Sequence, residues 1–101
     1  MNRSPITTHE ILTRLRVFKK RREAEYSLQS LGVFGSFARG EAKADSDVDI
    51  VFETGTPNLF LTSRMKRELE EILARRVDMV RLRRGMSPRL KQRILKDVRY
   101  V

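Results

Sequence analysis

Two acidic residues, Asp47 and Asp49, stand one residue apart inside the segment SDVDIVF, residues 46–52. Alternate residues of a β-strand project from the same face with Cα atoms about 6.5–7 Å apart, so both carboxylates can reach one cation or two neighbouring cations. Like charges this close raise a carboxyl pKa unless a cation compensates them. Magnesium suits such a pair, because it keeps several waters and takes one or two carboxylates together with nucleotide phosphates. The pair therefore predicts half of a magnesium site.

A third carboxylate, Asp78, lies in a later apolar segment between Val77 and Met79. A charge inside an apolar strand is costly without a partner. A metal shared with Asp47 and Asp49 would supply that partner and would complete a site for two metal ions. We therefore expect the metal ligands to be these three aspartates.

The dipeptide Gly35-Ser36 ends the apolar stretch 31–35 and opens a turn. Glycine lets the backbone approach a phosphate closely, and backbone amides and the Ser36 hydroxyl can donate hydrogen bonds to its oxygens. Taken alone, such a dipeptide is usually only a turn. Followed by alternating aspartates on the next strand, it favours a phosphate-binding segment within a catalytic motif over residues 34–53.

The elements that would position these residues follow from caps and apolar spacing. A capping box at Thr7-x-x-Glu10 opens the first helix, and Ser87-Pro88 opens the last. The expected order is a helix over about 8–25, a strand over 31–35, a helical turn over 36–42, a strand over 48–53, a helix opened by Pro57, a strand over about 77–82 and a helix over about 88–98.

Each of these elements has a face that should be buried. In the strand over 48–53, Val48, Ile50 and Phe52 point one way, while Asp47, Asp49 and Val51 point the other. The apolar stripe expected on the helix after Pro57 is Leu61, Met65, Leu69, Ile72 and Leu73, and on the last helix it is Leu90, Ile94, Leu95 and Val98. We also expect a surface ion pair between Glu71 and Arg75.

The composition limits the number of domains, the metal ligands and the kinds of partner that we expect. A chain of 101 residues indicates one domain, residues 1–101, and the absence of cysteine leaves any metal to oxygen ligands or to the single His9. The chain shows neither a membrane-length apolar run nor a signal peptide, so we expect a cytoplasmic protein without a membrane partner. The formal charge of +9 suggests an anionic partner, a nucleotide, a nucleic acid or an acidic protein, although a basic surface also simply keeps small proteins in solution.

The motifs FGSFARG, SDVDIVF and VDMV, with ten residues between Ser36 and Asp47, resemble the nucleotidyltransferase superfamily that includes DNA polymerase β. Within it, the chain is most similar to the minimal nucleotidyltransferases, or MNT proteins, along nearly its whole length. This resemblance implies an α/β (α+β) nucleotidyltransferase fold, a single domain with a small mixed sheet of about three strands packed with helices. It also implies an enzyme that binds ATP and Mg²⁺, with two metal ions, and transfers a nucleotidyl group to a hydroxyl.

The resemblance also implies a role for each matching residue. Gly35 and Ser36 would hold the triphosphate, and Asp47 and Asp49 would bind the metal ions. Asp78 would complete the metal site and assist deprotonation of the attacking hydroxyl. Arg39 would lie near the phosphates, the alternative being a surface salt bridge, and Lys43 is a further candidate.

Minimal nucleotidyltransferases of this size resemble antitoxins encoded beside HEPN-family ribonuclease toxins. The resemblance implies transfer of AMP from ATP to a tyrosine of the toxin, which adds bulk and negative charge near the ribonuclease site. Two alternatives stay open. One is an antitoxin that neutralises its toxin by stoichiometric binding without catalysis. The other is a basic nucleic-acid-binding regulator, motivated by 22 lysines and arginines, although no helix-turn-helix pattern stands out.

Overall fold

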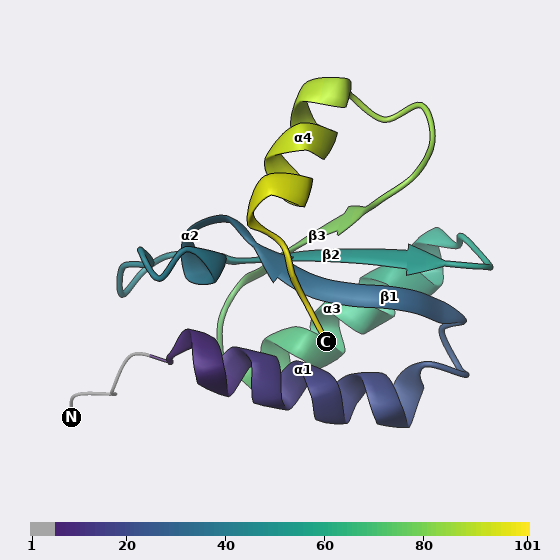
Figure 1. Cartoon of the computed structure of the whole chain (residues 1–101). Helices are drawn as coiled ribbons and strands as arrows, with labels where there is room; N and C mark the ends of the chain where they lie inside the picture. The colour runs from purple at the N-terminus through teal and green to yellow at the C-terminus, as the bar shows by residue number, and fades with distance from the viewer. Residues whose placement is uncertain (1–5) are drawn as a thin grey trace.

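The computed structural model describes residues 6–101, which form four helices and four strands (Figure 1). The first five residues of the expected domain lie outside the described residues. Along the chain the elements are α1 (Thr8–Arg22), β1 (Leu28–Phe34), α2 (Gly35–Ala38), β2 (Val48–Thr54), α3 (Leu59–Leu73), β3 (Val77–Arg81), α4 (Pro88–Asp97) and β4 (Arg99–Tyr100). None of these helices is long and apolar enough to cross a lipid bilayer.

The strands form one mixed sheet in the order β3-β2-β1-β4, which confirms the expected fold class. Strand β1 runs antiparallel to both β2 and β4, whereas β2 and β3 are parallel and are connected through α3. Four strands replace the three that were expected. The additional strand, β4, is only two residues long, too short to show an alternating pattern in the sequence.

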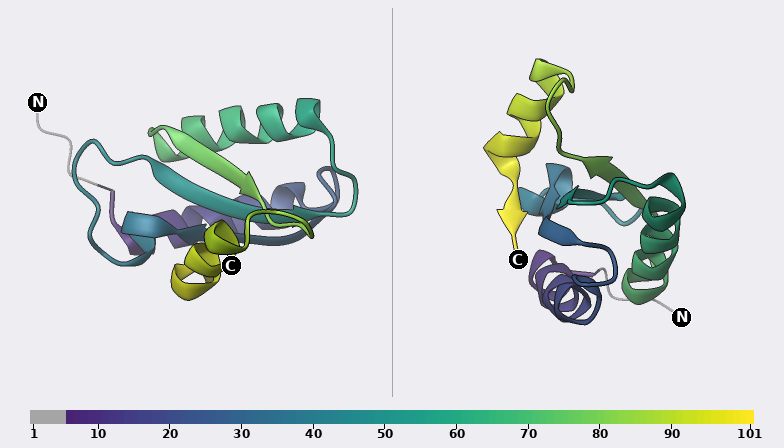
Figure 2. Two further views of the ribbon diagram at one scale, coloured as in Figure 1. Left: turned by 90° about the horizontal axis from the view of Figure 1, so that it is seen from above. Right: turned by 90° about the vertical axis from the view of Figure 1, so that its right-hand side faces the viewer.

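The sheet is covered unequally on its two faces (Figure 2). Helices α1 and α3 pack on one face, where Val48, Ile50 and Phe52 enter the main core. Helix α4 stands against the other face, where Val51 is fully buried in a smaller cluster with Met86 and Ile94. The alternation predicted for β2 is therefore present, and its second face is the one that α4 covers.

Two helix boundaries differ from expectation because neighbouring residues terminate or cap the helix. Helix α1 ends at Arg22 rather than near residue 25, since the chain turns there to bury Tyr26, whose ring stacks on Phe18 at 6.2 Å between centroids. Helix α3 begins two residues after Pro57, because the Asn58 side chain accepts hydrogen bonds from the backbone amides of Phe60 and Leu61.

The remaining boundaries also differ by one to four residues from those expected. Strand β1 begins at Leu28, three residues early, because Leu28 pairs with Thr54 across an irregularity in the ladder. Helix α2 is only the four residues Gly35–Ala38, β3 ends at Arg81, and α4 ends at Asp97. Val98 adopts an extended conformation, which leads the chain directly into β4.

Three side-chain expectations were wrong. Ile72 of α3 and Leu95 of α4 were expected inside, but they are 39% and 50% exposed, because each lies at the edge of its helix's buried stripe. Arg75 does not pair with Glu71. Ala74 adopts a left-handed conformation (φ 53°) that ends α3, and Arg75 then donates hydrogen bonds to the carbonyl oxygens of Ala44 and Ser46.

Gly32 of β1 pairs with Tyr100 of β4 and leaves no room for a side chain. A Cβ atom added there would lie 2.9 Å from the carbonyl oxygen of Arg99 and 3.0 Å from a methyl group of Val98. We therefore expect Gly32→Ala to lower the free energy of unfolding by about 1–3 kcal/mol, as overpacking does, measured by urea denaturation. Gly55→Ala is the matched control, since its Cβ would make only an ordinary contact at 3.5 Å. Equal stability of the two variants would contradict the close packing of β4 against Gly32.

Candidate functional site

Three aspartates lie near the start of β2 and β3. The parallel register of these strands places Asp49 directly beside Asp78, and Asp47 immediately precedes β2, two residues before Asp49. The amide of Val48 donates to the carbonyl oxygen of Arg76 at 2.9 Å, which extends the pairing of the two segments to the Asp47 side. Neighbouring strands lie about 4.8 Å apart, so Asp49 and Asp78 are close neighbours on the face that α4 covers. The structure thus brings together residues predicted from two separate motifs.

Asp49 occupies the least favourable environment for a negative charge. Its pKa is raised above the ordinary aspartate value, first by burial and then by repulsion from Asp78 and Asp47. The positive charges of Arg93 and Arg39 oppose this effect and lower the same pKa. Asp47 and Asp78, by contrast, are exposed. The cluster therefore carries uncompensated negative charge that a cation would relieve.

The donor set of this cluster fits a magnesium ion. Its donors are carboxylate oxygens, the ligands that hard divalent cations prefer. Across residues 6–101, however, no three or more histidine, cysteine, aspartate or glutamate side chains are gathered closely enough to hold a metal ion by themselves. Such an open arrangement is what magnesium tolerates, because water and nucleotide phosphates supply its remaining ligands. The residues that could hold the ion are Asp47, Asp49 and Asp78.

Gly35 packs directly against the Asp49 carboxylate. It follows Phe34, which pairs with Asp49 across β1 and β2, and its backbone is left-handed with φ 72°. A Cβ atom at residue 35 would collide with Oδ2 of Asp49. Glycine is therefore required twice, for its backbone conformation and for the space that the carboxylate occupies. This contact places the Gly35-Ser36 segment beside the metal-binding candidates, as a shared site for phosphate and metal would require.

The other residues predicted to lie near the phosphates are Ser36, Arg39 and Lys43. Ser36 is partly buried, and its carbonyl oxygen accepts a hydrogen bond from the amide of Glu41. The Arg39 guanidinium forms ion pairs with Asp97 at 2.8 Å and with Glu41 at 3.1 Å. Arg39 therefore forms the salt bridges that were the alternative to a phosphate-site role, and its positive charge also lowers the pKa of Asp49. Lys43 is exposed in the loop that precedes Asp47.

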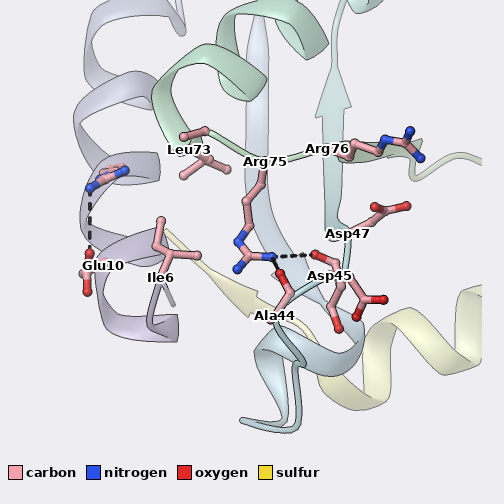
Figure 3. A pocket seen from close by; sticks show the side chains of 11 residues that line it. Ile6, Glu10, Ala44, Asp45, Asp47, Leu73, Arg75 and Arg76 are labelled. Atoms are coloured by element: carbon pink, nitrogen blue, oxygen red, sulfur yellow. Dashed lines mark hydrogen bonds and ion pairs between the residues drawn. The ribbon is translucent and has the colours of Figure 1, made fainter. Parts of the chain in front are cut away.

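A hollow of about 1010 Å³ opens beside Asp47, between the start of α1 and the end of α3 (Figure 3). Leu73 and Ile6 supply apolar lining, and Asp45, Asp47 and Arg76 stand at its charged side. Arg75 reaches across this hollow to the loop carbonyls of Ala44 and Ser46, as Figure 3 shows. Arg75 therefore holds in place the segment that leads into Asp47.

Sequence reasoning missed the supporting residues around the three aspartates. Arg75 was assigned to an ion pair on the surface, because nothing in the sequence indicates that Ala74 reverses the chain. Arg93 and Asp97 of α4 were not singled out. The available signal was helical spacing: Asp97 lies three residues after Ile94, which buries α4 against the sheet, and Arg93 lies four residues before Asp97.

The environment of Asp49 predicts a gain in stability on neutralising it. Because its pKa is raised in the folded protein, ionisation opposes folding, and stability is lost as the pH rises from the ordinary aspartate value of 3.8 through the folded-state pKa. At pH 7 without divalent cations, Asp49→Asn should therefore raise the melting temperature, and at pH values below that window the gain should vanish. Asp45→Asn, an exposed neighbour, should change little. A lower melting temperature for Asp49→Asn in EDTA at pH 7 would contradict the electrostatic account.

The chain matches a known protein family and a named relative along most of its length. The model of the nucleotidyltransferase domain family matches residues 15–101. The protein adenylyltransferase MntA of Thermococcus cleftensis is 36% identical over 97 residues, which cover 95% of this chain and 97% of that relative.

Solved structures show the same fold. A structure described as a candidate minimal nucleotidyltransferase superposes with a TM-score of 0.78 at 34% identity, covering 96% of this chain and 98% of the other. A crystal structure of a toxin-antitoxin with AMP-PNP gives a TM-score of 0.71 at 27% identity, covering 88% of this chain and 72% of the other. With the family match extending over most of the sequence and over all three clustered aspartates, this chain belongs to the nucleotidyltransferase domain family.

Proposed function

We propose that this protein is a magnesium-dependent protein adenylyltransferase that transfers AMP from ATP to a tyrosine hydroxyl of a HEPN-family ribonuclease toxin, and thereby acts as its antitoxin. The single observation that carries the proposal is the placement of Asp49 beside Asp78, with Gly35 packed against Asp49. The relative named as a protein adenylyltransferase and the toxin-antitoxin structure with AMP-PNP support the reaction and the partner.

The reaction requires positioning and charge stabilisation rather than a nucleophilic side chain. Asp47, Asp49 and Asp78 would hold Mg²⁺, which when bound neutralises charge on the triphosphate. The Gly35-Ser36 segment would donate hydrogen bonds to the phosphate oxygens. The attacking hydroxyl forms a bond to the α-phosphorus while the bond to the departing pyrophosphate breaks, and Asp78 would accept the hydroxyl proton.

An acceptor carried by another protein suits the exposure of this cluster. Asp47 and Asp78 are exposed, and the hollow beside Asp47 opens to solvent. A tyrosine on a partner surface can therefore approach the carboxylates without a change in the fold. Adenylylation would add bulk and negative charge to that surface, which opposes RNA binding by electrostatic repulsion.

The direct test is the intact mass of the toxin encoded beside this protein, incubated with this protein, ATP and Mg²⁺. We expect the toxin to gain one or more adenylyl units, and fragmentation should place them on tyrosine. The double variant Asp47→Asn, Asp49→Asn should transfer none, whereas Glu71→Gln should transfer as the wild type does, because Glu71 is an exposed carboxylate of α3 that does not line the hollow.

Each alternative has its own outcome in that experiment. An unchanged toxin mass, with a stable complex formed by the wild type and by the double variant, would leave an antitoxin that acts by binding alone. An unchanged mass without a complex, together with tight and steeply salt-dependent DNA binding, would favour the nucleic-acid-binding regulator.

The contact between Gly35 and Asp49 predicts a second effect on transfer. A Cβ atom at residue 35 displaces the Asp49 carboxylate, and a misplacement of about 1 Å costs roughly a hundredfold in rate. We therefore expect Gly35→Ala to lower kcat/KM by about that factor. Gly85→Ala is the matched control, because Gly85 also has a left-handed backbone (φ 80°) but open space around its Cβ position. Equal activity of the two variants would contradict the role of this contact.

A further inference from the structure

Helix α4 lies over the strand that carries Asp49. Its fully buried residue Ile94 packs in one cluster with Val51, which follows Asp49 by two residues and therefore shares its face of β2. Figures 1 and 2 show α4 rising from this face of the sheet close to α2. The inner side of α4 thus faces the carboxylate cluster and the phosphate-binding candidates.

Arg93 is an exposed residue on the side of α4 that carries Asp97. It lies one helical turn before Asp97, whose carboxylate holds Arg39 at 2.8 Å, so this side of α4 is directed toward α2. Helix α4 packs against α2, which begins with the Gly35-Ser36 segment, and the positive charge of Arg93 also lowers the pKa of Asp49. The structure therefore has a second arginine, in addition to Arg39, on the side of α4 that is directed toward α2.

The two arginines differ in how they are engaged. Arg39 is shared between two carboxylates, Asp97 and Glu41. Arg93 takes part in no ion pair within the part of the chain that the structure describes. No ion pair joins its guanidinium to Asp47, Asp49 or Asp78, so a separation remains between the arginine and these carboxylates. A group carrying oxygens on several sides, such as a phosphate, can bridge that separation while a cation neutralises the carboxylates.

We propose that Arg93 is a nucleotide-binding residue of this site, which binds the β- and γ-phosphates of the nucleoside triphosphate and then the departing pyrophosphate; this inference rests on the proposed function. Arginine suits the role because its planar fork of N–H donors matches phosphate oxygens and always carries its charge. Gly35 and Ser36 would contact the same phosphates from the α2 side, so that the polyphosphate lies between α2 and α4. The adenosine and α-phosphate would not touch Arg93.

The test compares two probes, inorganic tripolyphosphate and AMP, by isothermal titration calorimetry with Mg²⁺. Charge-assisted hydrogen bonds are strong enough that Arg93→Gln should weaken tripolyphosphate binding by about tenfold to a hundredfold, and AMP binding should stay within about twofold. Arg93→Lys should recover part of the loss, since it restores the charge but not the fork. Lys91→Gln is the control and should bind both probes as the wild type does, because Lys91 is exposed and two residues along a helix place it on nearly the opposite side of α4 from Arg93.

Every outcome bears on the inference. Equal affinities of Arg93→Gln and Lys91→Gln for tripolyphosphate would overturn it, as would equal losses for tripolyphosphate and AMP, or no tripolyphosphate binding by the wild type. Transfer assays separate this inference from the proposed function. AMP transfer by Arg93→Gln with an unchanged KM for ATP would overturn the inference alone. Selective loss of tripolyphosphate binding in Arg93→Gln, without any transfer by the wild type, would overturn the proposed function alone.

Discussion

The candidate site depends on the parallel pairing of β2 with β3, which sets Asp49 beside Asp78. A parallel pair needs a crossover connection, and α3 supplies it by burying Met65, Leu69 and Leu73 against the sheet. A slip of one residue in this register would turn Asp78 toward the hydrophobic core. The apolar packing of α3 therefore excludes alternative registers, and the alignment of the two aspartates follows from that packing.

Bringing carboxylates together opposes folding, and the surrounding structure limits the effect. Asp49 alone is half-buried, while Asp47 and Asp78 remain exposed to water that screens their charges. Helix α4 contributes positive charge through Arg93, and Asp97 holds Arg39 on the same side. The helix thus has two roles, since Ile94 buries Val51 and its charged residues surround the acidic cluster. The site resembles other functional sites in which unfavourable electrostatics is kept for binding.

The approach to Asp47 is tied to the end of α3 through one side chain. Ala74 leaves the helix in a left-handed conformation, and Arg75 then bonds to two loop carbonyls, at 2.8 Å to Ala44 and 3.1 Å to Ser46. Backbone carbonyls that have no partner in a sheet or helix need such donors. A loop without secondary structure of its own is in this way positioned by a helix whose core-facing residues are fixed by packing.

The sequence by itself determined the local features whose causes are local. Alternation in SDVDIVF placed Asp49 on the face opposite the core, the caps at Thr7 and Ser87 marked two helix starts, and Gly35 indicated a close approach. Only the tertiary structure decided the partner of each residue. It set Asp49 beside Asp78, directed Arg75 to the loop carbonyls instead of Glu71, and added β4 beside Gly32. It also packed α4, with Arg93 and Asp97, against α2. These outcomes depend on strand register, on one left-handed residue and on the docking of α4. They arise from contacts between segments far apart in the chain, which periodicity and capping within a single segment do not encode.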